Sequence, residues 1–181
     1  MIHKTERLIL RPWEDEDAEN LYKYAKDPLV GPKAGWRVHT SVENSLELIR
    51  SVLSAPETYA VCLKEDNKAI GSIGIHMGER GNISIAKDEA EIGFWIGLPF
   101  WGQGLIAEAV RELMRYAFED LGIKRLWSAY FDGNVQSKRV MEKCGFKYQY
   151  SKNDLMWEPL NEVKTLHVTC IDIAFYSSIS S

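Results

Sequence analysis

The sequence has little cysteine: three residues, Cys62, Cys144 and Cys170, in a chain of 181. The count is odd, no two cysteines form a Cys-x-x-Cys pair, and each thiol stands among apolar neighbours. Disulfide-stapled secreted domains carry more cysteines, and zinc sites use closely spaced pairs. We therefore expect three reduced thiols packed in a core, with neither a metal site nor a catalytic thiol.

The sequence also lacks an excess of positive charge and a long apolar run. Its 22 Lys and Arg stand against 26 Asp and Glu, so no overall positive field attracts nucleic acid or an anionic membrane. The longest uncharged stretch, Ile92 to Ala107, has 16 residues and contains four glycines, whereas a membrane-spanning helix needs about 20 apolar residues. The N-terminus carries no apolar segment of the kind that directs export. We expect a cytoplasmic protein with no nucleic-acid or membrane partner.

What the sequence does contain is ordinary globular composition, 45% hydrophobic and 27% charged. A chain of this length buries roughly 70% of its unfolded surface in one core. No repeat, low-complexity segment or linker divides the sequence. We expect a single domain over residues 1–181.

Hydrophobic periodicity predicts groups of strands around a few helices, which favours an α+β fold with a mixed sheet. The predicted strands are Arg7–Pro12, Tyr59–Leu63, Ala69–Met77, Glu89–Ile96, Arg125–Phe131, Phe146–Tyr150 and Lys164–Tyr176. The predicted helices run from Asp15 to Pro28, from a Thr40 and Glu43 capping box to Pro56, over 105–121, and from Asn134 to Cys144, while Gly31–His39 is predicted to be a loop.

The segment Phe100–Glu108 is glycine-rich and opens the most regular amphipathic helix. Gly102 and Gly104 let the backbone turn sharply and expose amide N–H groups, and the helix N-terminus adds a partial positive charge. Together these features form an anion cradle suited to a pyrophosphate. The segment lacks the Lys-Ser/Thr of a nucleotide P-loop, and Ala107 replaces the third glycine of a dinucleotide motif. The two common nucleotide-binding motifs therefore do not describe it.

Four segments follow one another in a characteristic order and spacing. They are Thr5-Glu6-Arg7-Leu8-Ile9-Leu10-Arg11-Pro12, then Glu91-Ile92-Gly93-Phe94-Trp95-Ile96, then Trp101-Gly102-Gln103-Gly104 with Glu108-Ala109, and finally Asn134-Val135-Gln136-Ser137 with Glu142-Lys143-Cys144-Gly145-Phe146. In this order they resemble the GNAT N-acetyltransferase superfamily, and more narrowly the branch that includes the ribosomal-protein N-terminal acetyltransferases. The resemblance covers residues 5 to about 150.

The resemblance implies a three-layer fold with helices on both faces of a mixed, mostly antiparallel, twisted sheet that splits in a V. Acetyl-CoA is expected in the V, where strand backbone aligns the pantetheine and polarises the thioester carbonyl. One departure is Pro99, which stands where family members usually carry Gln or Arg and puts one phosphate contact in question. The implied cofactor-binding residues are Phe94, Trp95, Ile96, Gly102, Gln103, Gly104, Ile106, Ala107, Asn134 and Ser137.

The resemblance also implies that Ser137 hydrogen-bonds the departing thiolate and that Asn134 contacts pantetheine or water. Many relatives place a tyrosine acid four residues after this serine, where Met141 stands here, which leaves Ser137 as the candidate. From the residues alone, Asn134 and Ser137 equally fit an N-cap and a first-turn polar residue. The Lys138–Arg139 pair either meets the 3′-phosphate of CoA or forms a solvated helix face.

On the acceptor side, Glu91 is the candidate general base, acting through water. A Lys side chain with a pKa of ~10.4 is almost fully protonated at pH 7, whereas an α-amine at ~7.7–8.0 is partly neutral and needs a base less. The alternative is that Glu91 is an ordinary exposed strand acid. Trp36 and His39 are expected to shape the acceptor site; otherwise Trp36 covers the core and His39 only precedes a helix cap.

The resemblance, with these residues, implies an acyltransferase: an N-acetyltransferase that moves acetyl from acetyl-CoA directly to a primary amine in a ternary complex. The amine belongs to a protein N-terminus or to a small molecule. The alternative is a non-catalytic module that senses acyl-CoA, which Pro99 and Met141 allow. The last strand, Thr165–Tyr176, is long and apolar, and an uncovered edge of this kind favours a homodimer.

Overall fold

The computed structural model describes residues 1–83 and 85–180, and a twisted eight-stranded sheet runs through it in the order β1-β2-β3-β4-β5-β6-β8-β7. Neighbouring strands are antiparallel except β5 and β6, which are parallel. The predicted mixed, mostly antiparallel sheet is thus confirmed. The strands are β1 (His3–Lys4), β2 (Leu8–Arg11), β3 (Thr58–Leu63), β4 (Ala69–His76), β5 (Glu89–Ile96), β6 (Arg125–Phe131), β7 (Lys147–Trp157) and β8 (Glu162–Asp172).

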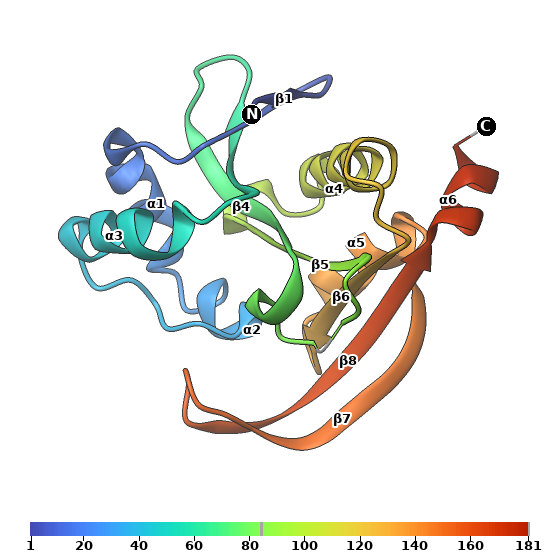
Figure 1. Cartoon of the computed structure of the whole chain (residues 1–181). Helices are drawn as coiled ribbons and strands as arrows, with labels where there is room; N and C mark the ends of the chain where they lie inside the picture. The colour runs from blue at the N-terminus through green and yellow to red at the C-terminus, as the bar shows by residue number, and fades with distance from the viewer. Residues whose placement is uncertain (84, 181) are drawn as a thin grey trace.

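Helices cover both faces of the sheet, as predicted (Figure 1). Apolar residues of α4 (Leu105–Arg115) pack with Ile75 and Ile92 in the larger core. On the opposite face, α1 (Ala18–Ala25) packs with Ala60 and Cys62. The remaining helical segments are η1 (Asp15–Asp17), α2 (Gly31–Ala34), α3 (Val42–Leu48), η2 (Ile49–Leu53), η3 (Gly78–Arg80), η4 (Leu98–Phe100), η5 (Tyr116–Asp120), α5 (Val135–Lys143) and α6 (Ile173–Ile179).

The sheet splits between its two parallel strands. Over the described residues, the register of β5 with β6 ends at the pair Glu91 and Trp127, although β5 continues to Ile96. Just beyond this point the Ser128 hydroxyl donates to the Ile92 carbonyl at 2.9 Å. Past Ile92, therefore, β5 pairs with β4 alone and its other backbone edge faces an opening. This is the V predicted from the sequence.

The C-terminal part of the chain differs from its prediction. The last strand ends at Asp172 and not at Tyr176, because the Asp172 side chain accepts a hydrogen bond from the Phe175 amide at 2.8 Å and caps α6. β8 also lies between β6 and β7, so the edge strand is β7 (Figure 1). The edge-strand reason for expecting a homodimer was therefore wrong.

Three smaller predictions also need correction. The segment predicted as a loop over Gly31–His39 contains the short helix α2, which Gly35 ends in a left-handed conformation. The cap of α3 is Ser41, whose hydroxyl accepts from the Asn44 amide at 3.0 Å, and not Thr40. The strand predicted over Phe146–Tyr150 continues to Trp157 because it pairs with β8 along most of its length. No described helix is long and apolar enough to cross a bilayer.

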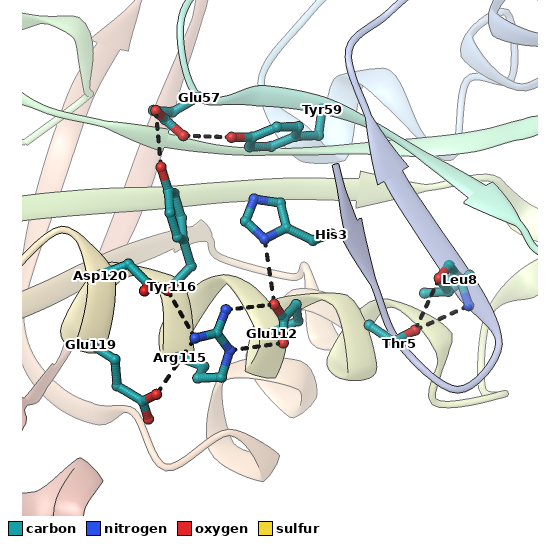
Figure 2. Close-up of polar contacts among 10 residues, drawn as sticks. All are labelled: His3, Thr5, Leu8, Glu57, Tyr59, Glu112, Arg115, Tyr116, Glu119 and Asp120. Carbon is teal, nitrogen blue, oxygen red and sulfur yellow. Dashed lines mark hydrogen bonds and ion pairs between the residues drawn. The ribbon is translucent and has the colours of Figure 1, made fainter. Parts of the chain in front are cut away.

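A buried polar cluster ties the N-terminal strand to the end of α4 (Figure 2). His3 is 5% exposed, and its Nδ1 lies 3.4 Å from the Glu112 carboxylate. Nearby, the Tyr59 and Tyr116 hydroxyls donate to the two oxygens of Glu57 at 2.5 and 3.4 Å. The cluster therefore joins β1, β3 and the α4–η5 helix, which are far apart in the sequence.

Ionisation of Tyr59 is expected to lower the free energy of unfolding at alkaline pH. Burial, and then the hydrogen bond to Glu57, raise the pKa of Tyr59. Its contribution is complete below the unfolded pKa of about 10 and is lost as the pH rises toward the higher folded pKa. We expect Tyr59→Phe to lower the free energy of unfolding by about 1 kcal/mol at pH 7 and to weaken the decline above pH 10. Urea unfolding from pH 7 to 11 measures both effects.

The control is Tyr150→Phe, which alters a tyrosine that is 39% exposed on β7. It should leave the decline in the alkaline range as steep as in the unmodified protein. If the free energy of unfolding of Tyr59→Phe fell as steeply above pH 10, the contact between Tyr59 and Glu57 would not be the cause of the decline.

Candidate active site

A cavity of about 260 Å³ opens where β5 and β6 separate. Its walls come from the end of β5, the glycine turn, the first turn of α4, the segment around α2 and one face of α5. Among the cofactor residues predicted from the sequence, those that line the cavity are Phe94, Trp95, Ile96, Gly102, Gly104, Ile106, Ala107, Asn134 and Ser137. Five of the predicted cofactor residues form the cradle: Gly102, Gln103, Gly104, Ile106 and Ala107. Four of these five and the strand end thus meet at one cavity, because the V places them on its two sides.

The glycine turn presents the N-terminus of α4 to this cavity. Gly102 and Gly104 both have φ of +75°, and Gly104 is the N-cap of the helix. Gln103, the fifth cradle residue, lies outside the cavity lining. Its side-chain amide donates to the Pro99 carbonyl at 2.9 Å, so Pro99 closes the turn through its backbone. The first amides of α4 have no partners within the helix, so they can donate to an anion in the cavity.

The N-terminal motif Thr5-Glu6-Arg7 holds this turn in place. The Arg7 guanidinium donates to the Gln103 carbonyl at 3.1 Å and to the Glu108 carboxylate at 2.8 Å. The Arg7 amide and the Thr5 hydroxyl also donate to Glu108, at 2.8 and 2.5 Å. Burial alone would raise the pKa of Glu108, but these hydrogen bonds lower it below its usual range. The first and third sequence motifs therefore form one structural unit.

Three cations line the cavity: Lys33, Arg139 and Lys143. The sequence argument paired Arg139 with Lys138, but Lys138 lies on the other side of α5, 3.9 Å from Glu142 and beside a separate cavity. Successive helical residues point about 100° apart, whereas residues four apart share a face. The spacing of Arg139 and Lys143 was thus the signal for this basic face. Lys33 had no such signal, because tertiary packing brings α2 to α5.

Asn134 acts as the N-cap of α5. Its side-chain oxygen accepts from the Ser137 amide at 3.2 Å, and its side-chain amide donates to the Lys33 carbonyl at 3.0 Å. The residue therefore fixes both α5 and the end of α2 beside the cavity. The Ser137 side chain is half-buried and lines the cavity, and over the residues that the structure describes its hydroxyl has no hydrogen-bond partner.

Glu91 is 3% exposed, so the alternative of an exposed strand acid is wrong. One carboxylate oxygen accepts from the amides of Asn82 and Ile83 at 2.6 and 3.1 Å, and the other accepts from the Asn82 side chain at 3.3 Å. Burial raises the pKa of Glu91, while these hydrogen bonds and the charge of Lys152 partly offset the rise. Glu91 lies outside the cavity lining, on the opposite sheet face from Ile92.

Trp36 and His39 lie behind the cavity wall. The Trp36 ring is half-buried, and its centroid is 5.3 Å from that of Trp95, which lines the cavity. His39 is 8% exposed, and its Nδ1 lies 2.8 Å from the Ser45 hydroxyl. Burial lowers the pKa of His39. Trp101 also lines the cavity, and its indole donates to the Ile96 carbonyl at 2.9 Å.

Comparisons with known proteins agree with this geometry. Residues 7–147 match the acetyltransferase (GNAT) domain family. The chain is 30% identical over 148 residues to the uncharacterized N-acetyltransferase p20 of Bacillus licheniformis, covering 79% of this chain and 80% of that protein. The crystal structure of a GNAT-family acetyltransferase from Bacillus anthracis superposes with a TM-score of 0.83 at 23% identity, covering 95% of this chain and 98% of that chain.

The fold is also shared with the ribosomal-protein-S5-alanine acetyltransferase of Vibrio fischeri, with a TM-score of 0.72 at 17% identity over 95% of this chain and 96% of that chain. The family match covers well over half of the chain, and the cradle and the V lie within it. The chain therefore belongs to the GNAT acetyltransferase family and is an N-acetyltransferase that uses acetyl-CoA.

Proposed function

We propose that the enzyme transfers the acetyl group of acetyl-CoA directly to a primary amine while both substrates are bound. The observation that carries this proposal is the V-shaped opening, where the unpaired edge of β5 meets the amide cradle of α4 in one cavity. A long, extended thioester with a diphosphate at its far end fits a strand edge that leads to a helix N-terminus. The carrier would thus be held at both ends, with its thioester beside β5.

Each part of the cavity has a proposed task. The first amides of α4 bind the diphosphate, and Lys33, Arg139 and Lys143 supply positive charge near the phosphates. The backbone of Phe94–Ile96 aligns the pantetheine and polarises the thioester carbonyl. Ser137 donates a hydrogen bond to the thiolate as the C–S bond breaks. Glu91 lies on the acceptor side of β5, outside the cavity lining, and supports deprotonation of the amine without contacting it.

Direct transfer is supported by the state of the thiols. A covalent acetyl-enzyme would need an accessible nucleophile with a low pKa. Cys62, Cys144 and Cys170 are each 7% exposed or less. Burial raises the pKa of Cys144 to about 11 and those of Cys62 and Cys170 to about 12. At neutral pH these thiols are protonated and enclosed, so the amine is expected to attack the thioester itself.

The acceptor that we favour is the α-amine of a protein or peptide N-terminus. An α-amine is partly neutral near pH 7, in contrast to a Lys side chain, and this suits a site in which Glu91 does not reach the cavity. The Vibrio fischeri structure with the same fold is named for acetylation of a ribosomal-protein alanine. A small-molecule amine is the second class of acceptor to be tested.

The test measures thiol release from acetyl-CoA against a defined panel. The panel holds peptides with free N-terminal Ala or Ser, the same peptides with blocked N-termini and one free Lys, spermidine, and free amino acids. We expect turnover with the free N-termini, a 42 Da mass gain, and intersecting initial-velocity lines. Parallel lines would contradict direct transfer. Turnover only with spermidine or amino acids would move the acceptor to small molecules, and no release across the panel would contradict the proposal.

A further inference from the structure

Gly74 of β4 and Gly93 of β5 form a strip without side chains, here called the slot, near the cofactor cavity. On the face opposite the main core, three successive pairs join β4 to β5: His76 with Glu91, Gly74 with Gly93, and Ser72 with Trp95. The middle pair has no side chains, so only backbone stands between the polar first pair and Trp95. Trp95 and the adjacent Phe94 line the cavity. The slot therefore lies between Trp95, at the cavity, and the pair of His76 and Glu91.

The His76 ring leans over this slot. Its Nε2 lies 3.5 Å from the position that a Cβ on Gly93 would take, and its Cε1 lies 3.3 Å from the equivalent position on Gly74. The ring is partly exposed, and with the side chains that the structure describes neither of its nitrogens forms a hydrogen bond or an ion pair. An imidazole with a free nitrogen thus faces the residue that precedes Phe94.

A second polar group at the slot lacks a partner. The Thr58 hydroxyl is buried and forms no hydrogen bond with any described residue. It lies 3.3 Å from the same Gly74 position that the His76 ring approaches. Buried hydroxyl groups are normally hydrogen-bonded to protein or water. The Thr58 hydroxyl lies near a ring carbon of His76, so it does not occupy either ring nitrogen.

Glu91 cannot serve this ligand directly, because both of its oxygens are engaged by Asn82 and Ile83 and its side chain is buried. Gly81 also packs against it: a Cβ there would stand 2.2 Å from the Glu91 carboxylate. Paired residues on one sheet face have Cβ atoms about 5 Å apart. Glu91 is therefore the cross-strand neighbour of His76, while its carboxylate is bound to the loop and does not touch the substrate.

We infer that His76 is the catalytic base that takes the proton from the acceptor ammonium, and that Glu91 is a positioning residue that holds the 81–83 loop and stabilises the imidazolium. This inference rests on the proposed function. The ammonium gives one proton to His76 Nε2, which later passes it to solvent. The neutral amine then forms the C–N bond, the C–S bond breaks, and the second N–H proton goes to the CoA thiolate, giving amide and thiol.

The charges around His76 fit this role. Burial, and then the charge of Arg80 on η3, lower the pKa of His76, so the imidazole is neutral at pH 7 and able to accept a proton. On the neighbouring strand β5, Glu91 is paired with His76, and the charge of Lys152 on β7 acts on Glu91. On the other side, Thr58 of β3 is uncharged. Arg80 is thus the charge that acts on the ring, and Glu91 is its cross-strand neighbour.

The test compares His76→Gln with the unmodified enzyme from pH 6 to 9.5, with saturating acetyl-CoA and the panel amine that turns over fastest. We expect kcat/KM for the amine to fall about 30-fold at pH 7, less than the usual ~100-fold for a general base because an α-amine is partly neutral. The acid limb of the pH profile of kcat/KM should move from below pH 6.5 to the amine's own pKa near 8. The loss of kcat/KM should therefore shrink to a few-fold at pH 9.5. Added imidazole should restore part of the activity of the His76→Ala variant at pH 7.

His167→Gln is the matched control, since His167 lies on β8 and binds Ser151 and Asp132 instead. It should keep the unmodified pH profile. An unchanged profile in His76→Gln, or a loss of the same factor at every pH without imidazole rescue of His76→Ala, would overturn the inference while leaving acetyl transfer intact. No turnover by the unmodified enzyme with any panel amine would overturn the proposed function, and this inference with it.

Discussion

Replacing Gly102 by valine is expected to lower kcat/KM for acetyl-CoA about 100-fold, which corresponds to roughly 2.7 kcal/mol. Gly102 has φ of +75°, where a side chain costs about 1–2 kcal/mol. The turn relieves this strain by rotating its peptides, which turns cradle amides away from the diphosphate. Each such hydrogen bond to a charged group is worth roughly 1.5–3 kcal/mol. Steady-state kinetics with acetyl-CoA as the varied substrate measures the effect.

Gly122→Val provides a control for the backbone strain. Gly122 has φ of +69°, and a Cβ at either glycine meets nothing within 4 Å. Gly122 follows η5, outside the cavity lining. Both variants should lose a similar amount of thermal stability, but only Gly102→Val should lose affinity for acetyl-CoA. Equal kinetic losses in the two variants would argue against the cradle.

Removing the hydroxyl in Ser137→Ala is expected to lower kcat about 100-fold with little change in KM for acetyl-CoA, as for the loss of a group that acts in proton transfer. The Ser137 hydroxyl lines the cavity and has no partner in the described part of the chain. Its removal therefore costs no protein contact. A CoA thiolate resembles a Cys thiolate with a pKa of ~8.5, so the loss should be smallest at alkaline pH, where the thiolate leaves unprotonated.

Two variants separate this role from an effect on the helix. Val135→Ala changes the first turn of α5 at a side chain that is 50% exposed and lies outside the cavity lining. It should keep full activity. Ser137→Thr keeps the hydroxyl and should retain most of kcat. A kcat near that of the unmodified enzyme in Ser137→Ala would remove Ser137 from the chemistry.

The elements that frame the cavity were predictable because their signals are local. The apolar spacing over 105–121 describes one continuous buried face, and α4 with η5 covers it almost completely. Gly102 and Gly104 carry their own signal, since both occupy a left-handed conformation that favours glycine. The three cysteines are buried and free, as their apolar neighbours indicated.

The acceptor side was less predictable because its contacts join distant segments. Alternation placed Glu91 away from the apolar row, but the amides that enclose it come from Asn82 and Ile83, outside the strand pattern. His76 ends an unremarkable strand, and only the register of β4 with β5 brings it beside Glu91 and Gly93. A register shift of one residue would place His76 on the opposite face.

By itself, the sequence determined the family, the mixed sheet and the cradle, because helix period, strand alternation and the conformational freedom of glycine act within a few residues. Only the tertiary structure decided what surrounds them: that β8 is internal, that Glu91 is buried, and that Lys33 joins Arg139 at the cavity. These outcomes depend on strand order and on packing between segments far apart in the chain, which no local pattern of residues encodes.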